Sequence, residues 1–380
     1  MLTPANENEL AEAVAGAAGP LRIVGGGTRA VGAGAAGEVL STAGLSGIEL
    51  YEPGALTIVA KAGTPLAEIE AALAVENQCL PFEPMDHRAV LGTEGAPTIG
   101  GVVAGNVSGP RRIAAGACRD SLIGVRFVDG AGTVVKNGGR VMKNVTGYDL
   151  VKLMAGSYGT LGVLSEVSFK VLPGNAATAA VLIEGLHVAQ AIAAMSAALA
   201  SPFEVTGAAH APVGVGGDPV TMIRIEGFET SVDYRAGKLV DLLAPFGAAK
   251  IERRVAAAGE GTEPAWRWVR DAEMFAGTDE DVWRISVKPS DGVRLAEALG
   301  DARLLFDWGG GLVWAGVSPG SDIRSALADI PGHATLIRAD ADTHARVGTF
   351  HPEPAPLAAI TRGIREKFDP RGILNPGLMG

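Results

Sequence analysis

Three short glycine-rich stretches constrain this chain more than any other feature, at residues 25–29, 97–112 and 156–163. The second reads PTIGGVVAGNVSGPRR, an apolar segment in which small residues separate the glycines and two arginines end the run. A backbone without Cβ atoms can adopt positive φ and allows another group to approach closely. One such turn serves loop closure, whereas three in one region indicate a binding site built from backbone.

Each stretch has features that favour an anion. Residues 25–29, GGGTR, directly follow the expected strand LRIV, so successive N–H groups can form a concave nest, although a plain β-turn is the alternative. Thr98 is the expected cap of a short helix that begins with Gly100 and Gly101, and we expect its unpaired N–H groups and helix dipole to face a ligand. The third stretch, GSYGTLGV, predicts a tight turn before a buried strand.

A fourth glycine pattern fits the dinucleotide fingerprint but not its context. Residues 32–37 satisfy G-x-G-x-x-G, and Glu52 lies twenty residues after Gly32. The fingerprint requires its third glycine to begin a helix, whereas the following VLSTAG has strand and turn character. We therefore interpret this segment as a flexible loop and not as a Rossmann motif.

Length, charge and cysteine content narrow the class of protein. A chain of 380 residues favours two domains, and a net charge of −10 argues against nucleic acid or an anionic membrane face as the main partner. Cys79 and Cys118 are too few for a disulfide framework, a zinc ribbon or an iron–sulfur cluster, so we expect both to be small core residues. The acidic N-terminus, without an apolar run of ~20 residues, predicts a cytoplasmic protein.

The pattern of elements predicts an α+β fold. We expect a helix at residues 3–18 capped by Thr3, a helix that opens at Thr64-Pro65, and hairpins that turn at Pro53-Gly54 and Asp129-Gly130. The order strand, helix, strand, strand, helix, strand is expected twice, at residues 178–253 and 282–337. Two such units predict one sheet with helices on one face. A basic helix and a tail fixed by proline and glycine end the chain.

These segments together resemble the vanillyl-alcohol oxidase and p-cresol methylhydroxylase superfamily of flavoproteins, and within it the FAD-binding subunits of bacterial glycolate oxidases. The resemblance is carried by GGGTR, PTIGGVVAGNVSGPRR, KNVTGYDLVKLMAGSYGTLGVLSEVSFKVLP, WRISV, DWGGGLVW and FDPRGILNPG. It implies a two-subdomain FAD-binding domain of the p-cresol methylhydroxylase type at residues 1–173. It also implies an α+β cap domain with an antiparallel sheet at residues 174–340, and a C-terminal helix and tail at residues 341–380 that return to the flavin domain.

The resemblance assigns residues to each part of FAD. Residues 25–29 and 98–101 would hold the diphosphate, while Pro84 and Tyr148 would lie near the isoalloxazine and Asn375 would close over it. A core role for Tyr148 and a capping role for Asn375 are the alternatives. The expected FAD contacts are Gly25, Gly26, Gly27, Thr28, Arg29, Pro84, Pro97, Thr98, Ile99, Gly100, Gly101 and Ala104, with Asn106, Ser108 and Gly109 beside the ring or ribityl chain, Thr160, Gly162 and Val163 at the adenosine, and Asn375. We expect the FAD to be non-covalent, because GGGTR has no histidine and PTIGGVVAGNVSG has no cysteine.

Catalytic residues are less evident. Related 2-hydroxy-acid dehydrogenases carry a metal motif, H-x-G-D-G-N-x-H, whereas His344 and His351 share only its spacing, so we expect no metal site. Arg111, Arg112 and Arg119 are candidates for an anion clamp, although Arg119 and Asp120 alternatively form an internal ion pair. Arg111 and Tyr148 are weak candidates for catalysis.

The resemblance leaves three functions open. The first is a redox subunit of a glycolate oxidase complex, working with a second FAD subunit and an iron–sulfur subunit on glycolate or D-lactate, and reaching the inner face of the membrane only through them. The second is a self-sufficient flavoenzyme for a small hydroxy acid. The third, a binding scaffold without turnover, fits the intact glycine stretches less well. The missing metal motif favours the first. The tryptophans Trp266, Trp268, Trp283, Trp308 and Trp314 are expected mostly in the core and partly at a partner surface.

Overall fold

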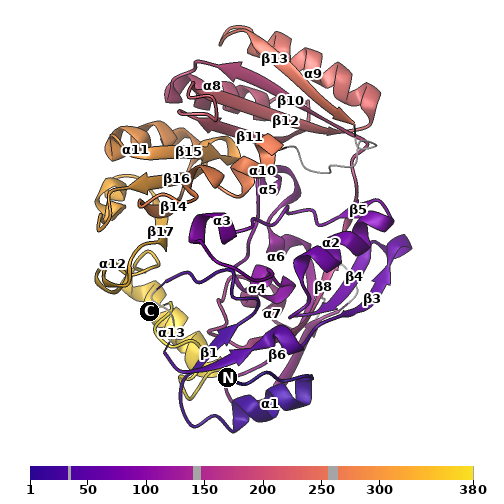
Figure 1. Cartoon of the computed structure of the whole chain (residues 1–380), viewed down its shortest axis with the longest axis vertical. Helices are drawn as coiled ribbons and strands as arrows, with labels where there is room; N and C mark the ends of the chain where they lie inside the picture. The colour runs from indigo at the N-terminus through magenta and orange to yellow at the C-terminus, as the bar shows by residue number, and fades with distance from the viewer. Residues whose placement is uncertain (33–35, 140–146, 256–263, 380) are drawn as a thin grey trace. The chain divides into compact units, whose positions relative to one another are not determined.

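The structure is a computed structural model that describes residues 1–32, 36–139, 147–255 and 264–379, and it divides into two compact units (Figure 1). Unit 1 comprises Met1–Ser108, Gly116–Gly174 and Pro352–Gly380, and unit 2 comprises Gly109–Ala115 and Asn175–His351. The first boundary lies one residue from the predicted one. Two other boundaries differ, because Gly109–Ala115 belongs to unit 2 and the C-terminal part of unit 1 begins at Pro352 instead of residue 341.

Unit 1 is built around a five-stranded antiparallel sheet in the order β3-β4-β8-β6-β7. Its strands are β3 (Ile48–Glu52), β4 (Thr57–Lys61), β6 (Leu122–Val128), β7 (Val134–Gly138) and β8 (Val163–Lys170). The predicted hairpins are confirmed as the pairs β3–β4 and β6–β7. The other elements near this sheet are η2 (Pro53–Ala55), α2 (Leu66–Val75), β5 (Gln78–Cys79), α3 (Arg88–Leu91), α4 (Ile99–Ala104), α6 (Cys118–Ser121), α7 (Leu150–Met154) and β9 (Leu172–Pro173).

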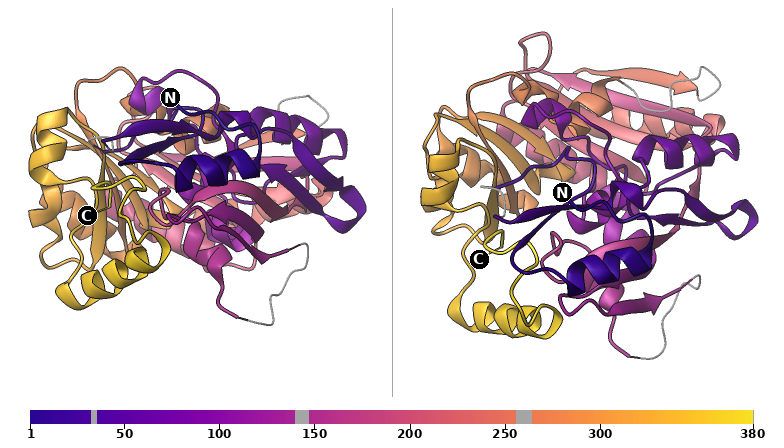
Figure 2. Two further views of the ribbon diagram at one scale, coloured as in Figure 1. Left: turned by 90° about the horizontal axis from the view of Figure 1, so that it is seen from below. Right: turned by 60° about the horizontal axis from the view of Figure 1, so that its bottom comes forward.

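A second layer of unit 1 joins the two ends of the chain. The parallel strands β1 (Leu21–Val24) and β2 (Glu38–Ser41), the latter followed by η1 (Thr42–Gly44), pack with α1 (Glu7–Ala15). Helix α1 is capped by Asn6, whose side chain accepts from Glu9 N–H, and not by Thr3 as predicted. The tail after α13 (Ala355–Phe368) returns to this layer (Figure 2). Arg371 in this tail donates to carbonyl groups at the end of α1. A strand begins directly after the G-x-G-x-x-G pattern, so no helix follows its third glycine; Gly34 itself lies outside the described residues.

Unit 2 contains one eight-stranded antiparallel sheet in the order β13-β10-β12-β11-β15-β16-β14-β17 (Figure 1). Its first half is β10 (Ala177–Glu184), α8 (Val188–Leu199), β11 (Val205–Ala211), β12 (Val220–Gly227), α9 (Glu229–Leu243) and β13 (Ala249–Val255). Its second half is β14 (Asp281–Val287), α11 (Gly292–Leu299), β15 (Arg303–Asp307), β16 (Leu312–Val317), η7 (Ile323–Leu327) and β17 (Gly332–Arg338). The predicted repeat is therefore confirmed, except that the last helix of the second half is a short 3-10 turn.

The two halves use the same strand order and meet where β11 pairs with β15 at His210 and Phe306. Unit 2 also contains α5 (Arg112–Ala115), α10 (Pro264–Arg270), η4 (Glu273–Phe275), η5 (Pro289–Asp291), η6 (Trp308–Gly310) and α12 (Ala341–Val347). One face of the sheet packs on α8, α9 and α11 and buries side chains such as Trp283 and Ile285. Since successive strand residues point to opposite faces, Arg284 and Ser286 lie on the other face.

Burial agrees with the expectation for most tryptophans and corrects the one for Cys79. Trp266, Trp283 and Trp314 are buried as expected, whereas Trp268 and Trp308 are half-buried. Cys118 is buried, but Cys79 is only half-buried, so its predicted core position is wrong. Over the described residues, no helix combines the length and apolar character needed to cross a membrane.

Candidate cofactor-binding site

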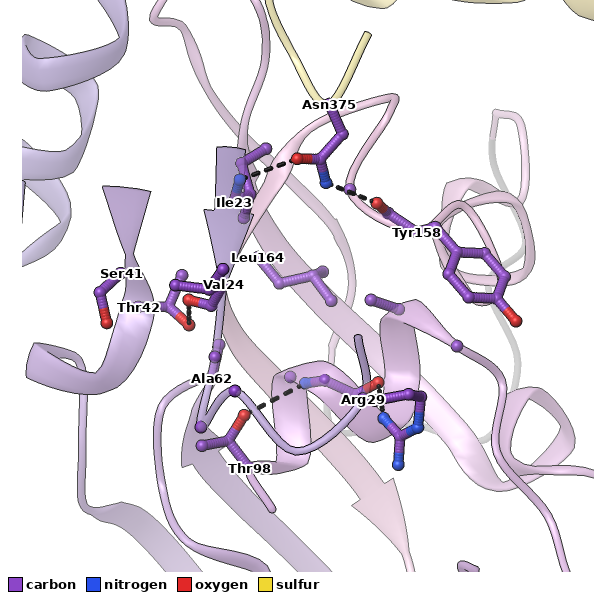
Figure 3. Close-up of a pocket in the computed structure, with 18 of the residues that line it drawn as sticks. Ile23, Val24, Arg29, Ser41, Thr42, Ala62, Thr98, Tyr158, Leu164 and Asn375 are labelled. Carbon is purple, nitrogen blue, oxygen red and sulfur yellow. Dashed lines mark hydrogen bonds between the residues drawn. The ribbon is translucent and has the colours of Figure 1, made fainter. Parts of the chain in front are cut away.

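The three glycine-rich stretches meet around a cavity of about 500 Å³ within unit 1 (Figure 3). The first stretch follows β1, the second forms α4, and the third is the turn between α7 and β8. The cavity volume lies in the range of small-molecule sites. The fold therefore brings together three segments that are far apart in the sequence.

Glycines of the first two stretches are required by protein packing. A Cβ at Gly25 would lie 2.4 Å from Thr98 Oγ1, and one at Gly26 would lie 1.6 Å from the Ala96 carbonyl oxygen. A Cβ at Gly100 would lie 2.7 Å from the Ala62 Cβ. At these positions the backbone lies close to another protein segment. This corrects the expectation that glycines occur there so that the backbone can approach a ligand.

Two other glycines open the cavity itself. Gly27 has a φ of +72°, and an added Cβ would meet no atom of the described residues within 4 Å. A Cβ at Gly101 would meet only Thr98 Oγ1 at 3.3 Å and Arg29 Nη1 at 3.6 Å. Both glycines line the cavity, so larger side chains there would extend into it.

The N-terminus of α4 does not offer the free donors that we predicted. Ile99 N–H donates to Thr64 O at 3.0 Å, Gly100 N–H to Ala62 O at 2.7 Å, and Gly101 N–H to Thr98 Oγ1 at 3.4 Å. Within the described residues, by contrast, the N–H groups of Gly27, Thr28 and Arg29 have no acceptor. The anion nest therefore lies in the first stretch rather than at the helix.

Arg29 supplies positive charge at the cavity. Its Nη1 donates to Gly101 O at 2.7 Å (Figure 3). Its Nε donates to His87 Nδ1 at 3.2 Å, so the half-buried guanidinium is fixed in orientation. Burial lowers the pKa of Arg29, yet a guanidinium stays protonated in proteins. A fixed guanidinium beside free N–H groups suits the diphosphate of a dinucleotide.

The third stretch and the C-terminal tail complete the wall. Tyr158 N–H donates to Ala104 O at 2.9 Å, which attaches the third stretch to the end of α4. Asn375 accepts from Ile23 N–H and donates from Nδ2 to Tyr158 O, each at 2.8 Å (Figure 3). Asn375 also lines the cavity, and its two hydrogen bonds hold the tail against β1 and the third stretch.

The structure separates the predicted FAD contacts into two groups. Those that line the cavity are Gly25, Gly26, Gly27, Thr28, Arg29, Thr98, Gly100, Gly101, Ala104, Gly162 and Asn375. Those outside its lining are Pro84, Pro97, Ile99, Asn106, Ser108, Gly109, Thr160 and Val163. Asn106 and Ser108 accept from Arg119 N–H and Cys118 N–H, so they hold a loop together. Thr42, Ala62 and Leu164 line the cavity but were missed, since no glycine pattern marks them.

The predicted anion clamp does not assemble as one group. Arg111 binds Glu226 through two hydrogen bonds, of 2.6 and 3.0 Å, and both side chains are largely buried in unit 2. Arg112 also lies in unit 2, whereas Arg119 is exposed in unit 1 and Asp120 pairs with Lys152 at 3.5 Å. The geometry therefore assigns Arg111 to packing rather than to substrate binding.

The structure also describes the surroundings of Tyr148, His344 and His351. Tyr148 is 88% exposed, so a core role for it is wrong. His344 Nδ1 pairs with the Thr349 hydroxyl, and His351 Nδ1 accepts from Ala334 N–H, so the two histidines have separate partners. No group of three or more residues suited to hold a metal occurs in the described part of the chain.

Comparison with known proteins first defines the class. Residues 1–138 match the FAD binding domain family, which covers the first two glycine stretches and accounts for a cavity with a cationic, N–H-rich wall. The chain is also 35% identical over 363 residues to glycolate oxidase subunit GlcE of Escherichia coli (strain K12), covering 95% of this chain and 92% of that one. The chain belongs to the GlcE family of FAD-binding oxidoreductase subunits, which confirms the predicted family and cofactor.

Two further similarities are shorter or more distant. Glycolate oxidase subunit GlcD of Bacillus subtilis (strain 168) is 42% identical over 76 residues, 20% of this chain and 16% of that one. A solved structure of alkyldihydroxyacetonephosphate synthase matches with a TM-score of 0.68 at 16% identity, covering 98% of this chain and 76% of that one. The latter supports the fold alone, and it agrees with the predicted α+β architecture.

Proposed function

We propose that this chain is the FAD-holding redox subunit of a complex that oxidises glycolate or D-lactate, two small 2-hydroxy acids. The observation that carries the proposal is the near full-length similarity to GlcE, together with the cavity of unit 1. The runner-up is a self-sufficient flavoenzyme that acts on the same kind of substrate.

The residues of unit 1 fit FAD. The N–H groups of Gly27, Thr28 and Arg29 and the Arg29 guanidinium would hold the diphosphate, while Gly101 leaves room beside them. Asn375 would keep the tail closed over the cavity through its two hydrogen bonds. When bound, FAD supplies an acceptor for the hydride of the hydroxy-acid carbon. The chain's share is to bind and orient the cofactor.

Two features favour partner subunits. Two cysteines do not suffice for an iron–sulfur cluster that would carry electrons away, and the described residues hold no metal-binding group that would assist removal of the hydroxyl proton. A second flavoprotein subunit and an iron–sulfur subunit would supply these parts. We place the complex in the cytoplasm, with contact to the inner face of the membrane made only through partners.

Co-expression tests this proposal. The chain would be purified alone and together with a second flavoprotein subunit and an iron–sulfur subunit of the proposed complex, and dye-linked oxidation of glycolate and D-lactate would be measured per FAD. We expect FAD in both preparations and rapid turnover only in the complex. Equal turnover per FAD by the lone chain would reject the subunit assignment in favour of the self-sufficient enzyme.

Whether FAD is covalently attached to the chain is tested in a separate experiment. Neither GGGTR nor PTIGGVVAGNVSG contains a residue at which covalently linked relatives attach the ring, so acid precipitation should leave yellow supernatant and a colourless pellet. Flavin that stays with the pellet would contradict non-covalent binding. Chromatography of the supernatant should give FAD instead of FMN.

A further inference from the structure

The second face of the sheet in unit 2 carries a cluster of basic and aromatic side chains that lies outside the cofactor cavity. Strands β14 and β17 pair so that Ser286 lies opposite His333 and Arg284 opposite Thr335. Their neighbours Ile285 and Ala334 point into the core on the helix-covered face. The polar side chains of both strands therefore share the face without α8, α9 and α11.

Trp308 fixes the centre of this cluster. Its indole Nε1 donates to Gly109 O at 3.1 Å, and its backbone N–H donates to Asp307 Oδ1 at 2.7 Å. The backbone of Trp308 has a φ of +53°, which is rare for a residue with a Cβ. The surrounding structure thus holds a half-buried ring in one orientation despite an unfavourable local backbone conformation.

Two guanidinium groups lie over this ring. The Cζ of Arg112 is 4.5 Å from the ring centroid and that of Arg284 is 5.2 Å from it. Such distances are typical of cation–π contact, which orients a guanidinium while leaving donors along its edges. Both arginines have further interactions, but five N–H donors on each allow a carboxylate to be bound in addition.

Other titratable groups lie near the ring. His333 is close to Arg284, His351 and Arg112, and its pKa is lowered first by burial and then by these three groups. The Asp307 carboxylate accepts the backbone N–H of Trp308. Two guanidinium groups therefore lie over a ring whose own residue is bound to Asp307, in a chain that is acidic overall.

We propose that Arg112 and Arg284, held on the ring of Trp308, bind the carboxylate of the small 2-hydroxy acid. This inference rests on the proposed function for the identity of the ligand, and on the geometry of unit 2 for its location. The planar guanidinium matches a carboxylate with two parallel hydrogen bonds, which an ammonium group cannot offer. The Ser286 and Thr335 hydroxyls on the same face are additional donors.

The test uses oxalate, which has the carboxylate but no C–H bond from which hydride can leave. Binding to the full chain with FAD would be measured by calorimetry and by tryptophan fluorescence, with uncharged ethylene glycol as the negative ligand. Arg284→Gln and Arg112→Gln should each weaken oxalate binding about 10-fold or more, since a charged hydrogen bond contributes about 1.5–3 kcal/mol. Arg253→Gln is the matched control, because Arg253 pairs with Glu229 and Asp233 of α9.

Each outcome decides the proposal. Weakened binding in both cluster variants, with control affinity unchanged and circular dichroism intact, supports it, and Arg284→Lys should recover only part of the affinity. No oxalate binding to the wild type, or equal affinities in all three variants, would overturn it. FAD content is measured in the same samples: a wild type that binds oxalate but no FAD would contradict the proposed function and leave the carboxylate site standing.

Discussion

The cofactor cavity of unit 1 and the cationic face of unit 2 are built from different parts of the chain. The cavity is bounded mainly by backbone and by glycines, with Arg29 as the guanidinium fixed at its wall by Gly101 and His87. The cationic face is made of side chains, with Arg112 and Arg284 stacked on Trp308. A backbone site fails when bulk is added, whereas a side-chain site fails when charge is removed.

The largest expected effect on cofactor binding breaks the backbone site alone. Gly101→Val should reduce FAD affinity at least ~100-fold, because a valine side chain at this cavity-lining position would extend into the cavity and press on Thr98 Oγ1. Equilibrium dialysis of the apo-protein with FAD measures the change. Gly54→Val is the control, since an added Cβ at this exposed turn meets no atom of the described residues within 4 Å. Equal FAD affinity in both variants would remove Gly101 from the site.

The next effect concerns the buried ion pair between Arg111 and Glu226 in unit 2. Glu226→Gln should destabilise unit 2 by about 3–5 kcal/mol, because it removes the buried carboxylate charge that pairs with Arg111 and Arg224. All five tryptophans lie in unit 2, so urea unfolding followed by tryptophan fluorescence reports this unit, while flavin fluorescence reports unit 1. Lys250→Gln, which breaks an exposed pair with Glu184, should change the tryptophan transition by about 0.5 kcal/mol or less. A similar shift in both variants would contradict the structural role given to Arg111.

A smaller effect distinguishes the units by pH. His210 is fully buried, and burial lowers its pKa from 6.5 to about 4, so the folded state keeps it neutral where the unfolded state takes up a proton. The contribution of neutral His210 to the free energy of unfolding is complete above pH 6.5 and is lost as the pH falls. The loss reaches about 2 kcal/mol at pH 5. His210→Gln should flatten the pH dependence of the tryptophan transition by that amount. An unchanged slope would show that His210 is protonated in the folded state or that it does not control the pH dependence. The control variant is His187→Asn, because His187 is exposed.

The smallest effect concerns closure of the cavity. Asn375→Ala removes hydrogen bonds to Ile23 and Tyr158, and should cost about 1–2 kcal/mol in the flavin-monitored transition and several-fold in FAD affinity. Asn6→Ala is the control, because it removes the cap of α1 at a residue that does not line the cavity. The control should lower stability by about 1 kcal/mol and leave FAD affinity unchanged. Unchanged FAD affinity in Asn375→Ala would mean that the tail does not contribute to the site.

The same contrast explains what the sequence predicted. Close approach at Gly25 and Gly26 and positive φ at Gly27 restrict the choice of residue there, so GGGTR predicts either a nest or a plain β-turn. The sequence did not reveal whether a glycine avoids a ligand or a neighbouring loop, and Gly25 and Gly26 proved to avoid the 96–98 segment. The prediction of free donors at α4 was wrong for a similar reason. The carbonyl groups of Thr64 and Ala62, which are far from the helix in sequence, accept hydrogen bonds from its first N–H groups.

The cationic face was beyond prediction because its members come from distant strands. The sequence marked Arg112, WRISV and the DWGGGLVW segment separately, whereas only the fold brings Arg112 and Arg284 to Trp308 and pairs the strand of His333 with that of Arg284. Pairing register decides which face a strand residue occupies, and a shift by one residue would place Arg284 in the core. The repeat of strands and helices in unit 2 could nevertheless be predicted from the sequence, because the hydrophobic periodicity within each element is a local property.

The most direct test of the account is an anaerobic absorption spectrum of the lone chain before and after addition of glycolate or D-lactate. The account predicts the spectrum of bound, oxidised FAD, little loss of absorbance on the timescale of turnover by the complex, and full bleaching when dithionite is added as a positive control. Rapid bleaching by a hydroxy acid at the rate of the complex would contradict the requirement for partner subunits. A preparation that takes up no FAD at all would contradict the cofactor site itself.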